Sequence, residues 1–263
     1  MFMLWRWFEH VQIYRPSREA DYRPEEFGLP AEDITLTAAD GVRLHAWWIP
    51  AAAGARRKQL AVLFCHGNGG NLTSRPGYYA AIRDAGVNVF AFDYRGYGRS
   101  EGKPTEEGTY RDARAAYRWL RDRGFAAEHI ILWGESLGGG IASQLALEEP
   151  VGGLVLHACF TCIPDLGGEI FPWLPVRWLA TIRYDTIHRL PRIRRPVLIL
   201  HSRHDDLIGF HHAEKNFAAA NEPKLLWELH GGHNEALSAD RSRYVAGWEK
   251  FLHQLEERLP SAQ

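Results

Sequence analysis

The chain has few cysteines and no apolar run of transmembrane length. Its 263 residues contain three cysteines, an odd number that suits a reducing compartment and argues against a fold held by disulfides. No stretch approaches the roughly 20 consecutive apolar residues that cross a bilayer. The first residues, Met1 to Phe8, lack the basic start and clean apolar core of a secretory signal. The sequence therefore predicts a cytoplasmic protein.

The N-terminal segment, residues 1–13, has two interpretations. It is short and rich in aromatic residues, so it either packs on the body of the protein or contacts a membrane surface. The second interpretation rests on Trp5, Arg6 and Trp7, because tryptophan and arginine favour the depth of lipid headgroups. Packing on the body is the interpretation that we favour.

An excess of charge of one sign is also missing. There are 31 lysines and arginines against 32 aspartates and glutamates, giving a formal net charge of -1. This balance argues against a nucleic-acid partner, whose phosphates are normally neutralised by a basic surface. Hydrophobic residues make up 46% of the chain, enough for the core of a single domain over residues 1–263.

Apolar segments alternate with helical patterns along the chain. The dipeptide Asp40-Gly41 is a hairpin signal between two predicted strands. Further continuous apolar strands alternate with helices, which is typical of a mostly parallel central sheet with helices on both faces. The sequence therefore predicts an α/β fold whose N-terminal edge is antiparallel. The predicted strands cover 34–37, 42–49, 60–64, 87–92, 130–133, 154–156, 197–200 and 225–229, and the clearest helices cover 78–85, 106–123 and 239–257.

One interval interrupts this alternation. Residues at about 160–192 are aromatic and broken by prolines, and the interval is too long for an ordinary connection between strands. We interpret it as a small cap over the carboxyl edge of the sheet, with Phe160, Phe171, Trp173 and Trp178 as candidate substrate-binding residues. The alternative is an extra packing layer that contacts no ligand.

The most informative stretch is Gly134-Glu135-Ser136-Leu137-Gly138, which has the form G-x-S-x-G. It follows an apolar strand and precedes a helix of small residues, the setting of a nucleophile elbow. Such a turn holds the serine in a strained conformation and lifts its hydroxyl clear of the sheet. Ser136 is therefore the candidate nucleophile. The alternative is a glycine-rich turn with the same sequence pattern and an ordinary serine.

A serine nucleophile needs a base, and the base needs an orienting carboxylate. The candidate base is His233, in a glycine-rich loop after the last strand, with His230 as its rival. The candidate carboxylate is Asp205, which follows the preceding strand, with Asp206 and Asp165 as alternatives. The order serine, aspartate, histidine is that of α/β-hydrolases and differs from both protease orders.

The oxyanion formed by attack on a carbonyl needs donors fixed in advance. One expected donor is the backbone N–H of Leu137, and the other is that of Asn68 in the glycine-rich loop 66–71. That loop lacks the lysine of a phosphate-binding loop and the spacing of a dinucleotide site, so no cofactor is expected.

A metal site is also not expected. His204, His211 and His212 lie near carboxylates, but their spacing matches no common metal-binding motif. We interpret them as solvated surface histidines.

Together these residues resemble the α/β-hydrolase superfamily over nearly the whole chain. Several stretches are similar to one branch of it, the Bem-type hydrolases and the related α/β-hydrolase-domain (ABHD) proteins of eukaryotic membranes. The resemblance implies a serine hydrolase that acts on an acyl ester or thioester without a cofactor, with Ser136, Asp205 and His233 at the triad positions. The stretches that carry it are residues 14–16, 40–45, 66–71, 93–100, 134–139 and 231–234.

Three functions are open, and the sequence favours the first of them. The first is hydrolysis of a carboxylic ester, with a small-molecule or lipid-like acyl ester as the partner of the site. The second keeps the same triad for an acyl-protein thioester or a peptide. The third is a non-enzymatic binding module on a hydrolase fold. Hydrolases of this fold that use a carboxylate nucleophile are disfavoured, because Ser136 occupies that position.

Overall fold

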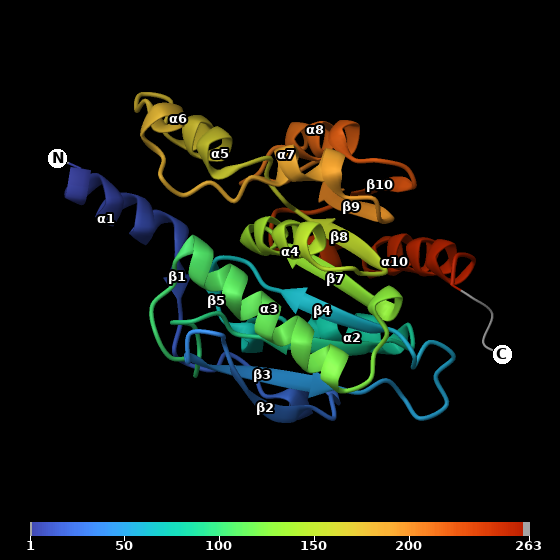
Figure 1. The fold of residues 1–263 in the computed structure, drawn as a ribbon. Coiled ribbons are helices and arrows are strands. Elements are labelled where there is room, and N and C mark those ends of the chain that lie inside the picture. Colours follow the sequence, from blue (N-terminus) through green and yellow to red (C-terminus); the bar gives the residue numbers. More distant parts are fainter. Residues whose placement is uncertain (1, 260–263) are drawn as a thin grey trace.

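The structure is a computed structural model that describes residues 2–259; the side chain of Phe2, Met1 and residues 260–263 are outside the description. Its centre is an eight-stranded sheet with the order β10-β9-β8-β7-β4-β6-β3-β2 (Figure 1). The hairpin β2–β3 is antiparallel, β3 also pairs antiparallel with β6, and the remaining pairs are parallel. The predicted fold class is confirmed. The strands are β2 (Glu32–Thr37), β3 (Arg43–Ile49), β4 (Ala61–Cys65), β6 (Asn88–Phe92), β7 (Ile130–Glu135), β8 (Gly153–His157), β9 (Val197–Ser202) and β10 (Lys224–Leu229).

Helices cover both faces of this sheet and create two apolar cores. Successive residues of β7 show why the strands are continuously apolar: Leu132 packs into one core and Trp133 into the other. Helices α3 (Glu106–Asp122), α4 (Leu137–Glu148) and α8 (His211–Ala219) lie on the first face, and α2 (Pro76–Asp84) and α10 (Arg241–Glu256) lie on the second (Figure 1).

The segment between β8 and β9 is the region predicted as a cap. It contains short helices instead of one crossover helix, and prolines stand at or near the start of several of them. These elements are α5 (Ile163–Ile170), α6 (Val176–Leu179), α7 (Thr186–Arg189) and the 3-10 turn η4 (Leu190–Arg192).

An N-terminal helix, α1 (Phe2–Ile13), packs against this cap. Trp5 donates its indole N–H to the carbonyl of Leu179 at 2.8 Å, and the rings of Phe8 and Phe171 lie 5.7 Å apart. In Figure 1, α1 lies at the same end of the molecule as α5 and α6. On its other side α1 exposes Met3, Leu4 and Trp7. No helix among residues 2–259 is both long enough and apolar enough to span a bilayer.

A short parallel pair links the end of α1 to the loop after β4. Strand β1 (Arg15–Pro16) pairs with β5 (Gly69–Gly70). This pair was not predicted from the sequence, because two-residue strands carry no periodicity. The remaining short elements are η1 (Pro24–Phe27), η2 (Leu72–Ser74), η3 (Ala127–His129) and α9 (Ala236–Ala239).

Candidate active site

Ser136 stands between β7 and α4 in a strained conformation. Its φ of 51° and ψ of -115° fall where residues with a side chain are rarely found. The turn is held by a hydrogen bond from the Ser136 N–H to the carbonyl of His157 at 2.8 Å. A Cβ at Gly138 would collide with the carbonyl group of Cys65, and one at Gly134 with the backbone of the α4 helix. The glycines of the motif are therefore required by close backbone approach.

The structure brings the three candidate triad residues into one hydrogen-bonded chain. Nε2 of His233 lies 3.2 Å from Oγ of Ser136, and Nδ1 of His233 lies 2.8 Å from Oδ2 of Asp205. Ser136, Asp205 and His233 follow β7, β9 and β10, respectively. Because parallel strands end at the same edge of a sheet, these three loops meet there.

The carboxylate of Asp205 is fixed by its surroundings. Its side chain is only 1% exposed, and its Oδ1 accepts the backbone N–H groups of Leu207 and Ile208 at 2.9 and 2.7 Å. Burial acts to raise the pKa of Asp205, but the hydrogen bonds from His233 and from these N–H groups outweigh it and lower the pKa. The group is therefore an anion that faces Nδ1 of His233.

The rival residues are placed elsewhere. Asp206 accepts the backbone N–H of His233 at 2.8 Å and does not contact its ring. Asp165 lies on the cap helix α5 and accepts the hydroxyl of Thr161. His230 is exposed, and its Nδ1 lies 3.4 Å from Asp240. Among the described residues, none of the three hydrogen-bonds to Oγ of Ser136 or to the ring of His233.

The two candidate oxyanion donors lie beside Ser136. Leu137 and Asn68 both contribute to the wall of the same cavity as Ser136. Within the described part of the chain, neither of their backbone N–H groups donates to an acceptor. Leu137 is also the first residue of α4, where the helix dipole favours negative charge.

The loop that carries Asn68 is held by the segment 93–100. The hydroxyl of Tyr97 donates to the carbonyl of Asn68 at 2.9 Å, and that of Tyr94 donates to the carbonyl of His66 at 2.8 Å. Asp93 accepts the N–H of Leu72 at 2.7 Å. These residues fix the backbone of the loop and do not touch Ser136 in the described structure.

Sequence reasoning missed a buried ion pair next to Ser136. Glu135 and Arg75 lie 2.8 Å apart, and Arg75 also donates to the carbonyls of Gly69 and Asn71. The pair therefore connects the elbow to the loop of Asn68. The available signal was the charged residue inside the G-x-S-x-G motif, because a charge at a buried turn requires a partner.

A cavity of about 250 Å³ adjoins Ser136. Phe160 and Phe171 are in its wall, as predicted for substrate-binding residues. Trp173 and Trp178 are not: their side chains are 74% and 91% exposed, so the expectation that they line the pocket is wrong. Trp178 lies on α6, and Trp173 lies in the turn before it.

Comparison with known proteins places the chain in a family. Residues 61–183 match the profile of the alpha/beta hydrolase fold. The chain is 32% identical over 279 residues to the alpha/beta hydrolase domain-containing protein WAV2 of Arabidopsis thaliana, covering 96% of this chain and 89% of WAV2. The chain belongs to the α/β-hydrolase family. It is also 39% identical over 227 residues to the Mycobacterium tuberculosis protein Rv2307c, covering 85% of this chain and 80% of that protein.

Solved structures show the same fold. The esterase Pf2001 of Pyrococcus furiosus superimposes with a TM-score of 0.77 and 20% identity, covering 93% of this chain and 98% of that one. The esterase EaEST of Exiguobacterium antarcticum gives a TM-score of 0.64 at 20% identity, covering 86% of this chain and 100% of that one. At this identity the similarity concerns the α/β-hydrolase fold alone.

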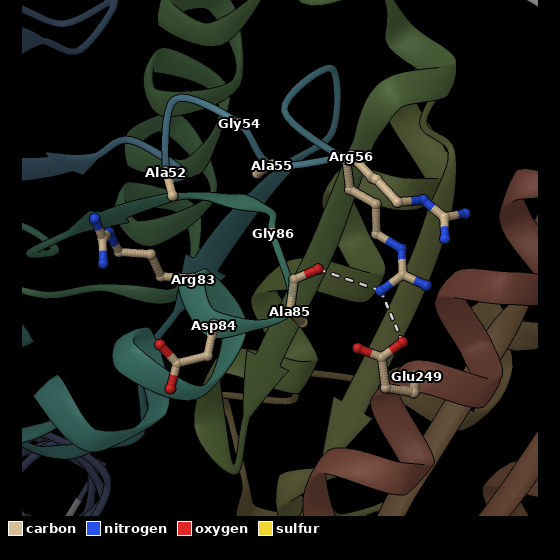
Figure 2. Close-up of a pocket in the computed structure, with 10 residues that line it drawn as sticks. Ala52, Gly54, Ala55, Arg56, Arg83, Asp84, Ala85, Gly86 and Glu249 are labelled. Carbon is tan, nitrogen blue, oxygen red and sulfur yellow. Dashed lines mark hydrogen bonds and ion pairs between the residues drawn. The ribbon is translucent and has the colours of Figure 1, made fainter.

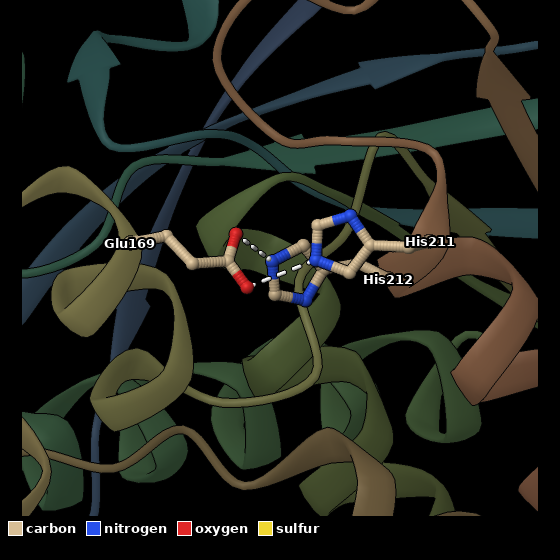
Figure 3. A group of neighbouring side chains, drawn as sticks. All are labelled: Glu169, His211 and His212. Carbon is tan, nitrogen blue, oxygen red and sulfur yellow. Dashed lines mark hydrogen bonds and ion pairs between the residues drawn. The ribbon is translucent and has the colours of Figure 1, made fainter.

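Outside the elbow, this α/β-hydrolase has a cluster of Glu169, His211 and His212 (Figure 3). Contrary to the expectation of surface histidines, His212 is fully buried. Its Nδ1 accepts the backbone N–H of Thr161 at 3.2 Å, so a neutral ring carries its proton on Nε2, which faces Glu169 at 3.1 Å. Both ring nitrogens are thus engaged without a metal, and the cluster fastens the cap helix α5 to α8.

Two further features of this α/β-hydrolase lie outside the described Ser136 cavity. Cys159 and Cys162 have C-x-x-C spacing, but burial raises their thiol pKa values to about 12 and about 11, so neither is a thiolate near neutral pH. A larger cavity of about 570 Å³, lined by Ala52, Arg83 and Glu249 among others, is open and lies near the amino ends of β4 and β6 (Figure 2). It is therefore at the edge of the sheet opposite Ser136.

Proposed function

We propose that the protein is a serine hydrolase that cleaves carboxylic esters. The observation that carries this proposal is the chain of contacts from Ser136 through His233 to Asp205, at 3.2 and 2.8 Å. The strained backbone of Ser136 supports it, because strain at a single polar residue beside a cavity is typical of a functional site.

The geometry supports a two-step reaction. Oγ of Ser136 attacks the ester carbonyl while Nε2 of His233 takes its proton, and Asp205 stabilises the resulting imidazolium through Nδ1. The N–H groups of Leu137 and Asn68 bind the oxyanion. The carbonyl re-forms as the alcohol leaves with the proton from His233, which gives an acyl-enzyme. Water, deprotonated by His233, then releases the acid and regenerates Ser136.

The same groups serve a thioester or a peptide, so the choice among these substrates rests on the pocket. A cavity of about 250 Å³ beside Ser136 favours an acyl group of modest size over a polypeptide. The similarity to WAV2 supports a place in the branch that resembles Bem-type and ABHD proteins. A binding module is disfavoured, because each of the three triad positions holds a competent side chain.

Hydrolysis of p-nitrophenyl butyrate by the purified protein tests the proposal. Ser136→Ala is expected to lower kcat by at least about 10³-fold, because the nucleophile is removed and the fold is kept. Ser238→Ala, an exposed serine of α9, is the matched control and should match the wild type. Equal turnover by wild type and Ser136→Ala would overturn the proposal.

A further inference from the structure

Two cavities have Ser136 in their walls. The smaller has a volume of about 250 Å³ and the larger a volume of about 500 Å³. Arg15, Asn68 and Leu207 also belong to both walls, so the two cavities meet at the candidate nucleophile. An ester bound with its carbonyl at Ser136 would place one of its two ends in each cavity.

The walls of the two cavities differ in chemistry. The smaller wall is mainly apolar, and it includes Ile13 of α1 together with Ile163, Leu166 and Ile170 of α5. The larger wall is polar and charged, and it includes Asp21, Ser74, Arg75, Glu135, His233 and Asn234. An alkyl chain therefore gains more free energy by burial in the smaller cavity than in the larger one.

The position of His233 indicates which end of the ester lies in which cavity. His233 contributes to the wall of the larger cavity and not to that of the smaller one. A general acid must lie within hydrogen-bond reach of the oxygen that it protonates, which here is the oxygen of the departing alcohol. We propose that the acyl chain lies in the smaller cavity, between α1 and α5, and the alcohol in the larger one. This inference rests on the proposed ester hydrolysis.

The alcohol cavity fits an uncharged polar group. Its buried charges are already paired, because Arg75 contacts Glu135 at 2.8 Å. Asp21 accepts the hydroxyl of Ser74, and Arg15 donates to Gln12. The remaining Arg15 and Asp21 charges balance each other, so the cavity favours neither a cationic nor an anionic alcohol.

The size of the apolar cavity limits the acyl chain. One water in the liquid occupies about 30 Å³, and a methylene group is similar in size, so the cavity holds about eight such groups. The substrate is therefore an ester of a short or medium linear acid, and a sixteen-carbon chain would extend beyond the cavity.

Helix α1 is a fixed wall of this cavity. The side-chain amide of Asn68 donates to the carbonyl of Ile13 at 3.1 Å, and the N–H of Arg15 donates to the carbonyl of Asn68 at 3.1 Å. The end of α1 is thus joined to the loop that carries the second oxyanion donor. A change at Ile13 consequently alters the acyl cavity directly.

An acyl-length series of p-nitrophenyl esters, from acetate to palmitate, tests the inference. We expect kcat/KM to rise about fourfold per methylene up to about eight carbons and then to stop rising. Ile13→Ala widens the cavity and should move the optimum to longer chains. Leu166→Trp narrows it and should move the optimum to shorter chains. Opposite movements of an optimum do not result from a general loss of stability.

Two further variants complete the design. Leu179→Trp is the control for Leu166→Trp, because it adds a tryptophan at a partly exposed position of α6 outside the cavity wall. It should leave the dependence of kcat/KM on acyl length unchanged. Asn234→Trp narrows the alcohol cavity and should leave the acyl optimum in place while lowering rates for bulky alcohols. A flat profile in an active enzyme, or an optimum moved by Asn234→Trp and not by Leu166→Trp, would overturn the orientation alone. No turnover of any ester, together with no labelling of Ser136 by a fluorophosphonate, would overturn the proposed function as well.

Discussion

The guanidinium of Arg75 and the carboxylate of Glu135 lie 2.8 Å apart in the interior of the protein, with side chains 11% and 8% exposed. Burial acts to raise the pKa of Glu135, but the charge and hydrogen bond of Arg75 outweigh it and lower the pKa to about 2. Glu135 precedes Ser136, and Arg75 also binds carbonyls of the Asn68 loop. The pair therefore holds the turn of Ser136 and the loop of Asn68 together.

Removal of one partner of this pair is expected to be costly. Arg75→Met leaves an unpaired buried carboxylate and should lower the free energy of unfolding by about 3–5 kcal/mol, measured by urea denaturation. The double variant Arg75→Met with Glu135→Leu should recover most of this loss, because no buried charge remains. Equal losses in the single and double variants would show that the pair has no such role.

The stability of the protein should fall at mildly acidic pH because of His157. This residue is buried among the rings of Tyr78, Trp133 and Tyr244, and burial lowers its pKa from 6.5 to about 4. The unfolded chain binds the proton more readily, so the contribution of His157 is complete above about pH 6.5 and is lost as the pH falls toward 4. The difference between the pKa values of His157 in the unfolded and folded states corresponds to about 3 kcal/mol in the free energy of unfolding.

The phenylalanine variant isolates this effect. His157→Phe keeps an aromatic ring but cannot titrate, so its unfolding free energy should change by about 3 kcal/mol less than that of the wild type between pH 7 and pH 4. Denaturant titrations at a series of pH values measure this difference. Parallel pH profiles for the two proteins would contradict the assignment.

Substitution of the adjacent residues Asp205 and Asp206 should have very different effects on kcat. In Asp205→Asn the carbonyl oxygen stays with the N–H groups of Leu207 and Ile208, so the amide NH₂ faces Nδ1 of His233. The ring proton then moves to Nε2, which can no longer accept the proton of Ser136, and kcat should fall roughly 10⁴-fold.

Asp206→Asn is the matched control. The amide of this variant keeps an oxygen for the backbone N–H of His233, so kcat should stay within about tenfold of the wild type. The two variants are compared by steady-state hydrolysis of one ester. Similar losses in both variants would favour Asp206 as the carboxylate that orients His233.

Tryptophans are exposed both on α1 and on the cap. Trp7, Trp173 and Trp178 are 63%, 74% and 91% exposed. We propose that these tryptophans contact a lipid surface, because tryptophan prefers the interface between headgroups and acyl chains. Sedimentation with phosphatidylcholine vesicles should carry the wild type down and leave Trp7→Ser with Trp178→Ser in the supernatant. Equal recovery of both proteins in the supernatant would refute the proposal.

The sequence was sufficient for the features that depend on local pattern. The alternation of apolar strands and helices predicted the parallel sheet, and Asp40-Gly41 predicted the hairpin of β2 and β3. Ser136, Asp205 and His233 were predicted as candidates because each follows a predicted strand, and parallel strands bring their carboxyl ends to one edge of the sheet. These residues are far apart in the chain but are placed together by the topology.

The features that the sequence did not predict depend on tertiary packing. Trp173 and Trp178 are exposed although they are aromatic, so residue type alone did not predict their burial. Helix α1 has no strong amphipathic pattern, and its place is set by contacts of Trp5 and Phe8 with the cap. His212 is likewise packed against a distant part of the chain, because its ring contacts Thr161 and Glu169, which come more than 40 residues earlier. No periodicity in a single sequence encodes such contacts.

The most direct test of the central claim is covalent labelling with a fluorophosphonate, read by intact mass and peptide mapping. The probe reacts with a serine only when a base and oxyanion donors activate it. We predict one adduct per chain on Ser136, lost in Ser136→Ala and kept in Ser238→Ala. The absence of an adduct under conditions that fully label a control esterase, or an adduct on another residue, would contradict the account.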